Sequence, residues 1–299
     1  MKIRRVGAYG LCRDADGRVL LARGSAESEF PGVWGLPGGG VEHGENPDDA
    51  VVREFAEETG FLVRVSGLRR ATADVARLPS NGALEHTDRL IYDVVVVGGA
   101  LRDEVDGTTD RVEWAIPDDR PLMPFTARLL GRPVPDAAVQ IEPDIPVSSS
   151  DKVQRFGAYA VATDPAGRIL LTQIAPRYPG AGLWHLPGGG TDYGETPEQG
   201  VARELVEETS QTGRITGLLG TSHRYDPAAV GPEGVRMDWH VIRVLFRVQV
   251  DTPTEPAVTE AAGGSTAAAR WFSAGEAGSL ELTEITRAAL ERLIGEKVS

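Results

Sequence analysis

The sequence has little cysteine, no long apolar run and no excess of basic residues. Its single cysteine, Cys12, cannot form a disulfide within the chain, which is typical of a protein in a reducing compartment. The longest apolar run, over residues 92–97, is far shorter than the roughly 18 residues of a membrane-spanning helix. A net charge of −13 argues against binding to a nucleic-acid backbone. We therefore expect a cytoplasmic protein that binds neither nucleic acid nor membranes.

What the sequence does contain is an internal repeat. Residues 5–60 align without a gap with residues 155–210, and 25 of the 56 aligned positions are identical. Identity at this level indicates a duplicated domain. Between the copies, residues 131–151 hold four prolines and a serine run without apolar periodicity, a composition typical of linkers. We expect domains over residues 1–130 and 152–299, joined by a linker at 131–151, and two copies able to pack as a pseudo-twofold pair.

Each copy predicts several strands and two helices, so the fold class is α/β, with helices packed on a mixed sheet. The predicted strands are residues 6–11, 18–22, 90–97, 169–172 and 241–250, and the last helix of each copy is predicted at residues 124–130 and 282–293. The three consecutive glycines Gly38–Gly40 and Gly188–Gly190 are expected to form turns whose carbonyls are free to coordinate a metal. Trp34 and Cys12 are expected to be buried packing residues.

The other helix of each copy begins with a clear start signal. In the first copy Asn46 is a favourable N-cap, and Pro47 suits the first helical position. In the second copy Thr196 is followed three residues later by Gln199, which predicts a capping box. Both copies should therefore start this helix at the same aligned position.

One face of this helix concentrates negative charge. At 100° per residue, Glu54, Glu57 and Glu58 fall on one arc with Arg53, while the neighbouring arc is apolar. The second copy repeats the pattern with Arg203, Glu204, Glu207 and Glu208. Three carboxylates on one face repel one another unless a cation lies among them, and a hard divalent ion such as Mg²⁺ takes oxygen ligands. An exposed acidic helix face is the alternative, but it explains neither the preceding glycines nor the recurrence of the whole arrangement.

These residues form the Nudix box, Gly-x5-Glu-x7-Arg-Glu-U-x-Glu-Glu-x-Gly-U, where U is apolar. The chain therefore resembles the Nudix hydrolase superfamily, in particular its MutT-like members, and contains two boxes. The first copy matches every specified position: Gly39, Glu45, Arg53, Glu54, Phe55, Glu57, Glu58, Gly60 and Phe61. The second departs at Ser210 and Gln211. Gly60 suits a left-handed helix end, whereas Ser210 costs on the order of 1 kcal/mol there unless the helix ends differently.

The resemblance implies an α/β/α sandwich and hydrolysis of a nucleoside diphosphate linked to another group, with Mg²⁺ or Mn²⁺ as cofactor. Glu57 and Glu58 would bind the metal with the Gly39 carbonyl. Glu54 would share the metal or deprotonate the attacking water, Arg53 would hold the carboxylates in place, and Glu45 would brace the loop. In the second copy the same roles fall on Glu207, Glu208, Gly189, Glu204, Arg203 and Glu195.

Other positions are weaker candidates. An additional acid outside the box could come from Glu104, Asp110 or Glu113, with Asp106 nearby, whereas the second copy keeps only Glu260. Substrate contacts could come from Arg177, Tyr178, Arg224 and Tyr225.

Two functions compete for this sequence. The first is an active pyrophosphohydrolase acting on a small phosphorylated, nucleotide-like substrate. The second is a sensor or scaffold in which at least one domain binds a nucleotide metabolite without turnover. The intact glutamates favour turnover. Because the second copy lacks the box glycine and most of the acidic loop, we expect the first copy to be the better catalyst.

Overall fold

The computed structural model describes residues 1–104, 107–116, 120–134, 152–230, 234–259 and 264–296. It divides into two compact units, Met1–Ser150 and Asp151–Ser299. Residues 135–151 of the predicted linker lie outside the described ranges, as do Asp106 and Glu260. In the described part of the chain, no helix has both the length and the apolar character needed to cross a bilayer.

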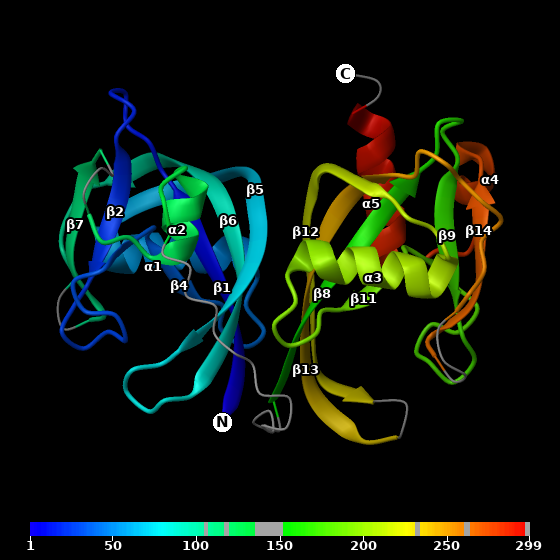
Figure 1. Cartoon of the computed structure of the whole chain (residues 1–299), viewed down its shortest axis with the longest axis horizontal. Coiled ribbons are helices and arrows are strands. Elements are labelled where there is room, and N and C mark those ends of the chain that lie inside the picture. Colours follow the sequence, from blue (N-terminus) through cyan, green and yellow to red (C-terminus); the bar gives the residue numbers. More distant parts are fainter. Residues whose placement is uncertain (105–106, 117–119, 135–151, 231–233, 260–263, 297–299) are drawn as a thin grey trace. The chain divides into compact units, whose positions relative to one another are not determined.

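Unit 1 is built on a mixed sheet (Figure 1). Its strands run in the order β4-β1-β6-β5, with β1 parallel to β6 and the other neighbours antiparallel. These strands are β1 (Lys2–Leu11), β4 (Gly38–Gly40), β5 (Phe61–Arg77) and β6 (Leu84–Gly99). A second sheet has the order β3-β2-β7, from β2 (Val19–Gly24), β3 (Trp34–Gly35) and β7 (Thr109–Ala115).

Helices cover both faces of the mixed sheet in unit 1. On one face, α1 (Pro47–Thr59) packs Phe55 so close to Gly10 that a Cβ there would lie 2.3 Å from the ring. On the other face, α2 (Pro124–Leu129) places the Phe125 ring 4.7 Å from that of Tyr9. Because neighbouring residues of a strand point to opposite faces, the two helices lie on opposite sides of β1. The predicted α/β/α sandwich is confirmed.

Unit 2 repeats this architecture. The sheet order is β10-β9-β8-β13-β12, with β11 paired to β8 and β14 to β9. A single bridge, Thr163 to Ile169, joins the two halves into one sheet. The strands are β8 (Lys152–Thr163), β9 (Ile169–Ile174), β10 (Trp184–His185), β11 (Gly188–Gly190), β12 (Arg214–Val230), β13 (Arg236–Gln249) and β14 (Thr266–Phe272). The helices are α3 (Pro197–Thr209), α4 (Ala274–Gly278) and α5 (Glu284–Glu296).

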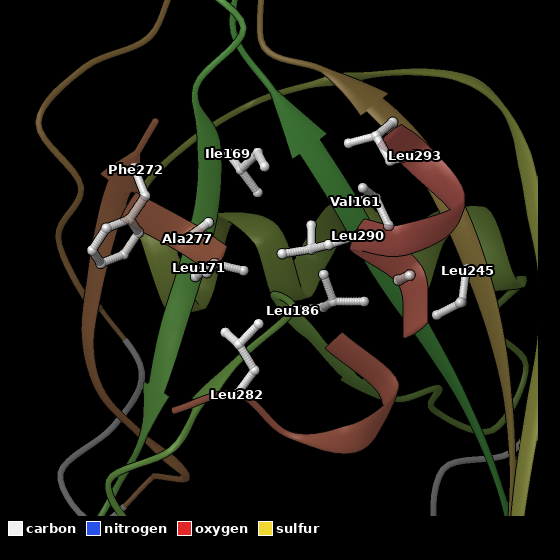
Figure 2. Close-up of a cluster of buried hydrophobic side chains, with 11 residues drawn as sticks. Val161, Ile169, Leu171, Leu186, Leu245, Phe272, Ala277, Leu282, Leu290 and Leu293 are labelled. Carbon is white, nitrogen blue, oxygen red and sulfur yellow. The ribbon is translucent and has the colours of Figure 1, made fainter. Parts of the chain in front are cut away.

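An apolar cluster of unit 2 lies between α5 and the sheet (Figure 2). Leu290 and Leu293 of α5 pack on Val161 of β8 and Leu245 of β13. Burying a leucine of this kind contributes about 1.5–3 kcal/mol. This core holds the side of the sheet opposite α3, which leaves α3 free to present its polar face.

The predicted helix ends are confirmed. The Asn46 side chain accepts a hydrogen bond from the Asp48 backbone at 3.1 Å, and Thr196 and Gln199 form the reciprocal capping box. Gly60 ends α1 in the left-handed conformation at φ 72°. Ser210 ends α3 in the same way at φ 56°, so the second copy keeps the helix end without the glycine.

The glycine-rich segments differ from the prediction. Gly38–Gly40 and Gly188–Gly190 are short strands paired with β1 and β8 and are not turns. The adjacent strands are also longer than predicted, because β5 with β6 and β12 with β13 form extended hairpins. The packing roles of Trp34 and Cys12 are confirmed, since 6% of Trp34 and 2% of Cys12 are exposed.

Candidate active sites

Arg53 connects three separate parts of the site in unit 1. Its guanidinium donates to both carboxylate oxygens of Glu45, at 2.9 and 3.0 Å, which brace the loop before the helix. It also donates to Glu54 at 2.9 Å and to Glu57 at 3.1 Å, both on α1. A further bond of 3.0 Å reaches the Gly40 carbonyl on β4. Chiefly because of the Glu45 hydrogen bonds, the pKa of Arg53 is raised, so this cation is always present.

Glu54 lies directly against the glycine strand. A Cβ built at Gly39 would lie 2.6 Å from its carboxylate oxygen, so only glycine leaves room for this carboxylate. Burial raises the pKa of Glu54, and the Arg53 charge partly opposes that shift. The glycine of the box is thus required by the packing of a carboxylate, not by a turn.

Glu58 is the most deeply buried carboxylate of the set, with 8% of the residue exposed. Its two oxygens accept hydrogen bonds from the Gly38 backbone at 2.8 Å and from the Thr109 hydroxyl at 2.6 Å. Burial is the main cause that raises the pKa of Glu58 to about 7. Near neutral pH this group is therefore balanced between its neutral and charged forms.

The corresponding contacts recur in unit 2. Arg203 donates to Glu195 at 3.0 Å through each of two nitrogens, to Glu204 at 2.9 Å and to Glu207 at 3.1 Å. It also donates to the Gly190 carbonyl at 3.0 Å. A Cβ at Gly189 would lie 2.7 Å from Glu204. Glu208 accepts from the Gly188 backbone at 2.8 Å and from the Thr266 hydroxyl.

The threonines that bond the last glutamates were not among the residues predicted for the site. Thr109 and Thr266 come from β7 and β14, far from the box in sequence. The available signal was their common spacing, since each stands five residues before a tryptophan, Trp114 or Trp271. These threonines attach β7 to α1 and β14 to α3.

The donor set suits a hard divalent cation, because each unit gathers several carboxylate oxygens and such ions prefer oxygen ligands. In the described ranges, however, no three His, Cys, Asp or Glu side chains are already arranged around a common metal position. The reason is that these carboxylates bond to arginine, threonine and backbone groups. The Gly40 carbonyl was predicted to be free but accepts from Arg53 instead. About half of the Glu57 side chain is exposed, which leaves it the most accessible oxygen donor.

Of the three additional acids predicted for unit 1, the structure places only Glu104 beside the site. Its carboxylate accepts from the Thr109 backbone at 3.0 Å, and its charge contributes to the raised pKa of Glu58. Asp110 instead forms an ion pair of 2.8 Å with Arg23. Glu113 forms ion pairs with two arginines, Arg111 at 2.9 Å and Arg120.

The predicted substrate contacts in unit 2 occupy two regions. Arg177 and Tyr178 lie in the loop between β9 and β10, where Arg177 is exposed and adopts a positive φ of 83°. Arg224 and Tyr225 are consecutive residues of β12 and so point to opposite faces of the sheet. Tyr225 lies beside His240, at a ring-centroid distance of 6.2 Å. The two side chains of the second pair therefore do not lie on one face of the sheet.

Comparison with known proteins identifies the same domain twice. The NUDIX domain family matches residues 1–132 and 153–293. An 89-residue stretch is 35% identical to an ADP-ribose pyrophosphatase of Methanocaldococcus jannaschii and covers 30% of this chain and 50% of that protein. A 58-residue stretch is 48% identical to the nucleoside triphosphatase NudI of Escherichia fergusonii and covers 19% of this chain and 35% of that one.

Solved structures include a similar protein, a MutT NUDIX hydrolase from Burkholderia pseudomallei. It is 32% identical, with 47% of this chain and 98% of that chain covered at a TM-score of 0.39. The present chain belongs to the NUDIX family, with one family domain in each unit. The two matches to curated relatives span half or less of those proteins.

Proposed function

We propose that this chain is a metal-dependent pyrophosphohydrolase that cleaves a nucleoside diphosphate linked to another group. The observation that carries the proposal is the contact set of Arg53, which recurs around Arg203 with every distance equal within 0.1 Å. A purely structural acidic surface would have no reason to keep this geometry in both copies. The single buried cysteine is consistent with a cytoplasmic enzyme.

The metal would be held by the glutamates of each helix. In unit 1 these are Glu54, Glu57 and Glu58, assisted by the Gly39 carbonyl, and in unit 2 they are Glu204, Glu207, Glu208 and the Gly189 carbonyl. When bound, Mg²⁺ or Mn²⁺ lowers the pKa of a coordinated water and neutralises charge on the phosphate oxygens. The ligands would have to exchange some of their present hydrogen bonds for the metal.

Glu54 is suited to accept the proton of the attacking water. Arg53 fixes one of its oxygens, while the glycine strand gives it room at the sheet edge. Burial raises its pKa, which brings the carboxylate closer to the strength useful in a general base. Arg53 acts as a positioning residue, because it aligns the loop, the strand and the helix around that carboxylate. Glu204 and Arg203 have these roles in unit 2.

The test is a substrate screen with matched variants of the full chain. Nucleoside triphosphates, dinucleotides and nucleotide sugars are incubated with Mg²⁺ or Mn²⁺, and the cleaved products are quantified. We expect Glu54→Gln combined with Glu204→Gln to lower kcat by about 10²–10⁴-fold, the usual contribution of a general base. Asp49→Asn, in the exposed first turn of α1, is the control and should retain full activity.

Two results would contradict the proposal. If the double variant kept its activity, the glutamates would have no catalytic role. If the wild-type chain turned over no substrate but bound nucleotides by calorimetry, the chain would be a sensor or scaffold.

A further inference from the structure

Unit 2 gathers arginines on the sheet face opposite α3. Directly paired residues of neighbouring strands carry their side chains on the same face. One row joins Gly190, Gly157, Arg243 and Ser222 across four strands. The next row joins Arg155, Val241 and Arg224. We call this surface, defined by Arg155, Arg224 and Arg243, the arginine face.

The arginine face begins at the strand that borders the carboxylates. On β11, the Gly188 backbone donates to Glu208 and the Gly190 carbonyl accepts from Arg203. Between β11 and Arg243 the row contains only Gly157, and the Tyr159 ring lies over that glycine, with one ring carbon 3.1 Å from where a Cβ would stand. At a spacing of about 4.8 Å per strand, the α-carbon of Arg243 lies roughly 10 Å from β11. Arg224 lies one strand further, on β12, so its α-carbon is at least roughly 14 Å from β11, and its long side chain would have to reach back toward a phosphorylated molecule at the carboxylates.

Unit 1 has the same face with one charge reversed. Arg5 and Arg89 occupy the register positions of Arg155 and Arg243, but Asp74 stands where unit 2 has Arg224. Asp74 forms an ion pair with Arg89, whose guanidinium is also 4.7 Å from the centre of the Phe125 ring. Only 5% of Arg89 is exposed. This arginine is therefore buried and already neutralised.

Arg243, the counterpart of Arg89 in unit 2, differs in its exposure and in its charged neighbours. It is partly exposed and lies 6.0 Å from the centre of the Tyr159 ring, and the described ranges contain no ion pair to it. Its Nε is buried without a hydrogen-bond partner there. Among the described residues, the ion pair of Arg224 is with Asp226, at 3.8 Å between exposed groups. Both arginines thus keep charge available for an anion.

Some of the other charged side chains of this face balance between the units. In unit 1, Arg70 is the register partner of Ile91, two residues along β6 from Arg89. The equivalent position in unit 2 is Gly220, and there the guanidinium of Arg292 supplies the positive charge. Glu85 carries a negative charge on this face of unit 1, and the residue at its register position in unit 2 is the uncharged Trp239. Asp226, the partner of Trp239 on β12, carries the corresponding negative charge in unit 2. The exchange of Asp74 for Arg224 changes the charge of this face by two. Two rows beyond Arg89, Asp93 of unit 1 corresponds in register to Arg247 of unit 2, which also makes the face of unit 2 more positive.

We propose that the arginine face of unit 2 binds a terminal phosphate, so that unit 2 prefers substrates with three or more phosphates. Unit 1, with Asp74, prefers diphosphates whose two phosphates are both esterified. Arginine recognises phosphate oxygens through paired hydrogen bonds, whereas a nearby carboxylate repels them. This inference rests on the proposed function, because the terminal phosphate is placed relative to a bond cleaved at the carboxylates.

The experiment measures each unit separately within the full chain. Glu54→Gln with Glu57→Gln inactivates unit 1, and Glu204→Gln with Glu207→Gln inactivates unit 2. The ratio of kcat/KM for ATP to that for ADP-ribose is then determined for each chain. We expect a ratio at least 10-fold higher when only unit 2 is active.

A charge exchange identifies the residue responsible. With only unit 2 active, Arg224→Asp should lower kcat/KM for ATP by about 10–100-fold, the range for losing a hydrogen bond to a charged group, and lower that for ADP-ribose much less. The control Arg214→Asp makes the same charge change at an exposed position of β12 and should alter neither value. With only unit 1 active, Asp74→Arg should raise the ratio.

Equal ratios in the two units, or equal losses for both substrates on Arg224→Asp, would overturn the inference. An effect of Arg214→Asp as large as that of Arg224→Asp would also overturn it. If neither substrate is cleaved, the proposed function fails, but the face can still be tested. Calorimetry with inorganic tripolyphosphate would then show weaker binding to Arg224→Asp than to wild type if the face binds phosphate, and equal binding if it does not.

Discussion

Burial of Glu58 makes the stability of metal-free unit 1 depend on pH in a defined direction. The pKa of this carboxyl is raised from an ordinary value of 4.5 to about 7, mainly because it is desolvated. The folded state therefore holds the proton more tightly than the unfolded state. Its stabilising contribution is complete below pH 4.5 and is lost as the pH rises through 7.

The size of the effect follows from the shift. Each unit of pKa difference corresponds to 1.36 kcal/mol, so the loss between pH 4.5 and pH 8 is at most about 3 kcal/mol. Glu58→Gln removes the titrating group and keeps the space filled. The amide oxygen can accept from the Gly38 backbone, and the amide nitrogen can donate to the Thr109 hydroxyl. We expect the variant to be more stable than wild type at pH 8 and to lack this part of the pH dependence.

Differential scanning calorimetry of the full chain with a chelator, from pH 5 to 8, measures this difference. Unit 2 is identical in the two proteins, so the change in the pH profile reports on Glu58 alone. Glu57→Gln is the matched control, because that side chain is about half exposed and its replacement removes no buried charge. Parallel profiles for wild type and Glu58→Gln would refute the argument from burial.

Three further predictions follow from the site and its glycines. Glu57→Gln should reduce total Mg²⁺-dependent product release more than Glu207→Gln does, because unit 1 has an additional acid beside its site. Equal losses from the two changes would contradict this. Gly39→Ala should lower kcat by about 100-fold, because the added methyl group displaces the Glu54 carboxylate. The control is Gly67→Ala, where a Cβ has no neighbour within 4 Å, and this variant should retain activity. Gly60→Ala should destabilise unit 1 by at least about 1 kcal/mol in urea unfolding, because φ is 72°, and an unchanged midpoint would argue against strain.

The features predicted correctly from sequence depend on short-range chemistry. The cap at Asn46 and the left-handed end at Gly60 need only a few neighbouring residues. The carboxylate face of α1 follows from helical periodicity alone. The Arg53 contacts to Glu54 and Glu57 could therefore be anticipated from the box.

The features that were missed depend on contacts between distant segments. Three glycines in a row indicate a turn locally, yet pairing with β1 makes Gly38–Gly40 a strand. Thr109 reaches Glu58 across 51 residues of sequence, and nothing near either residue marks the contact. Likewise, the opposition of Asp74 and Arg224 becomes visible only when the strand register places them at equivalent positions.

Arg53 joins a loop, a strand and a helix, and this has a consequence for how the site forms during folding. None of the three segments contains a binding site by itself, because the guanidinium must reach Glu45, Gly40 and Glu57 at once. A chain in which α1 is helical but detached from the sheet would hold the box residues without their arrangement. Metal affinity in this protein should therefore report the docking of α1 and α3 rather than their helix content. Refolding followed by Mg²⁺ binding would lag behind refolding followed by far-ultraviolet circular dichroism.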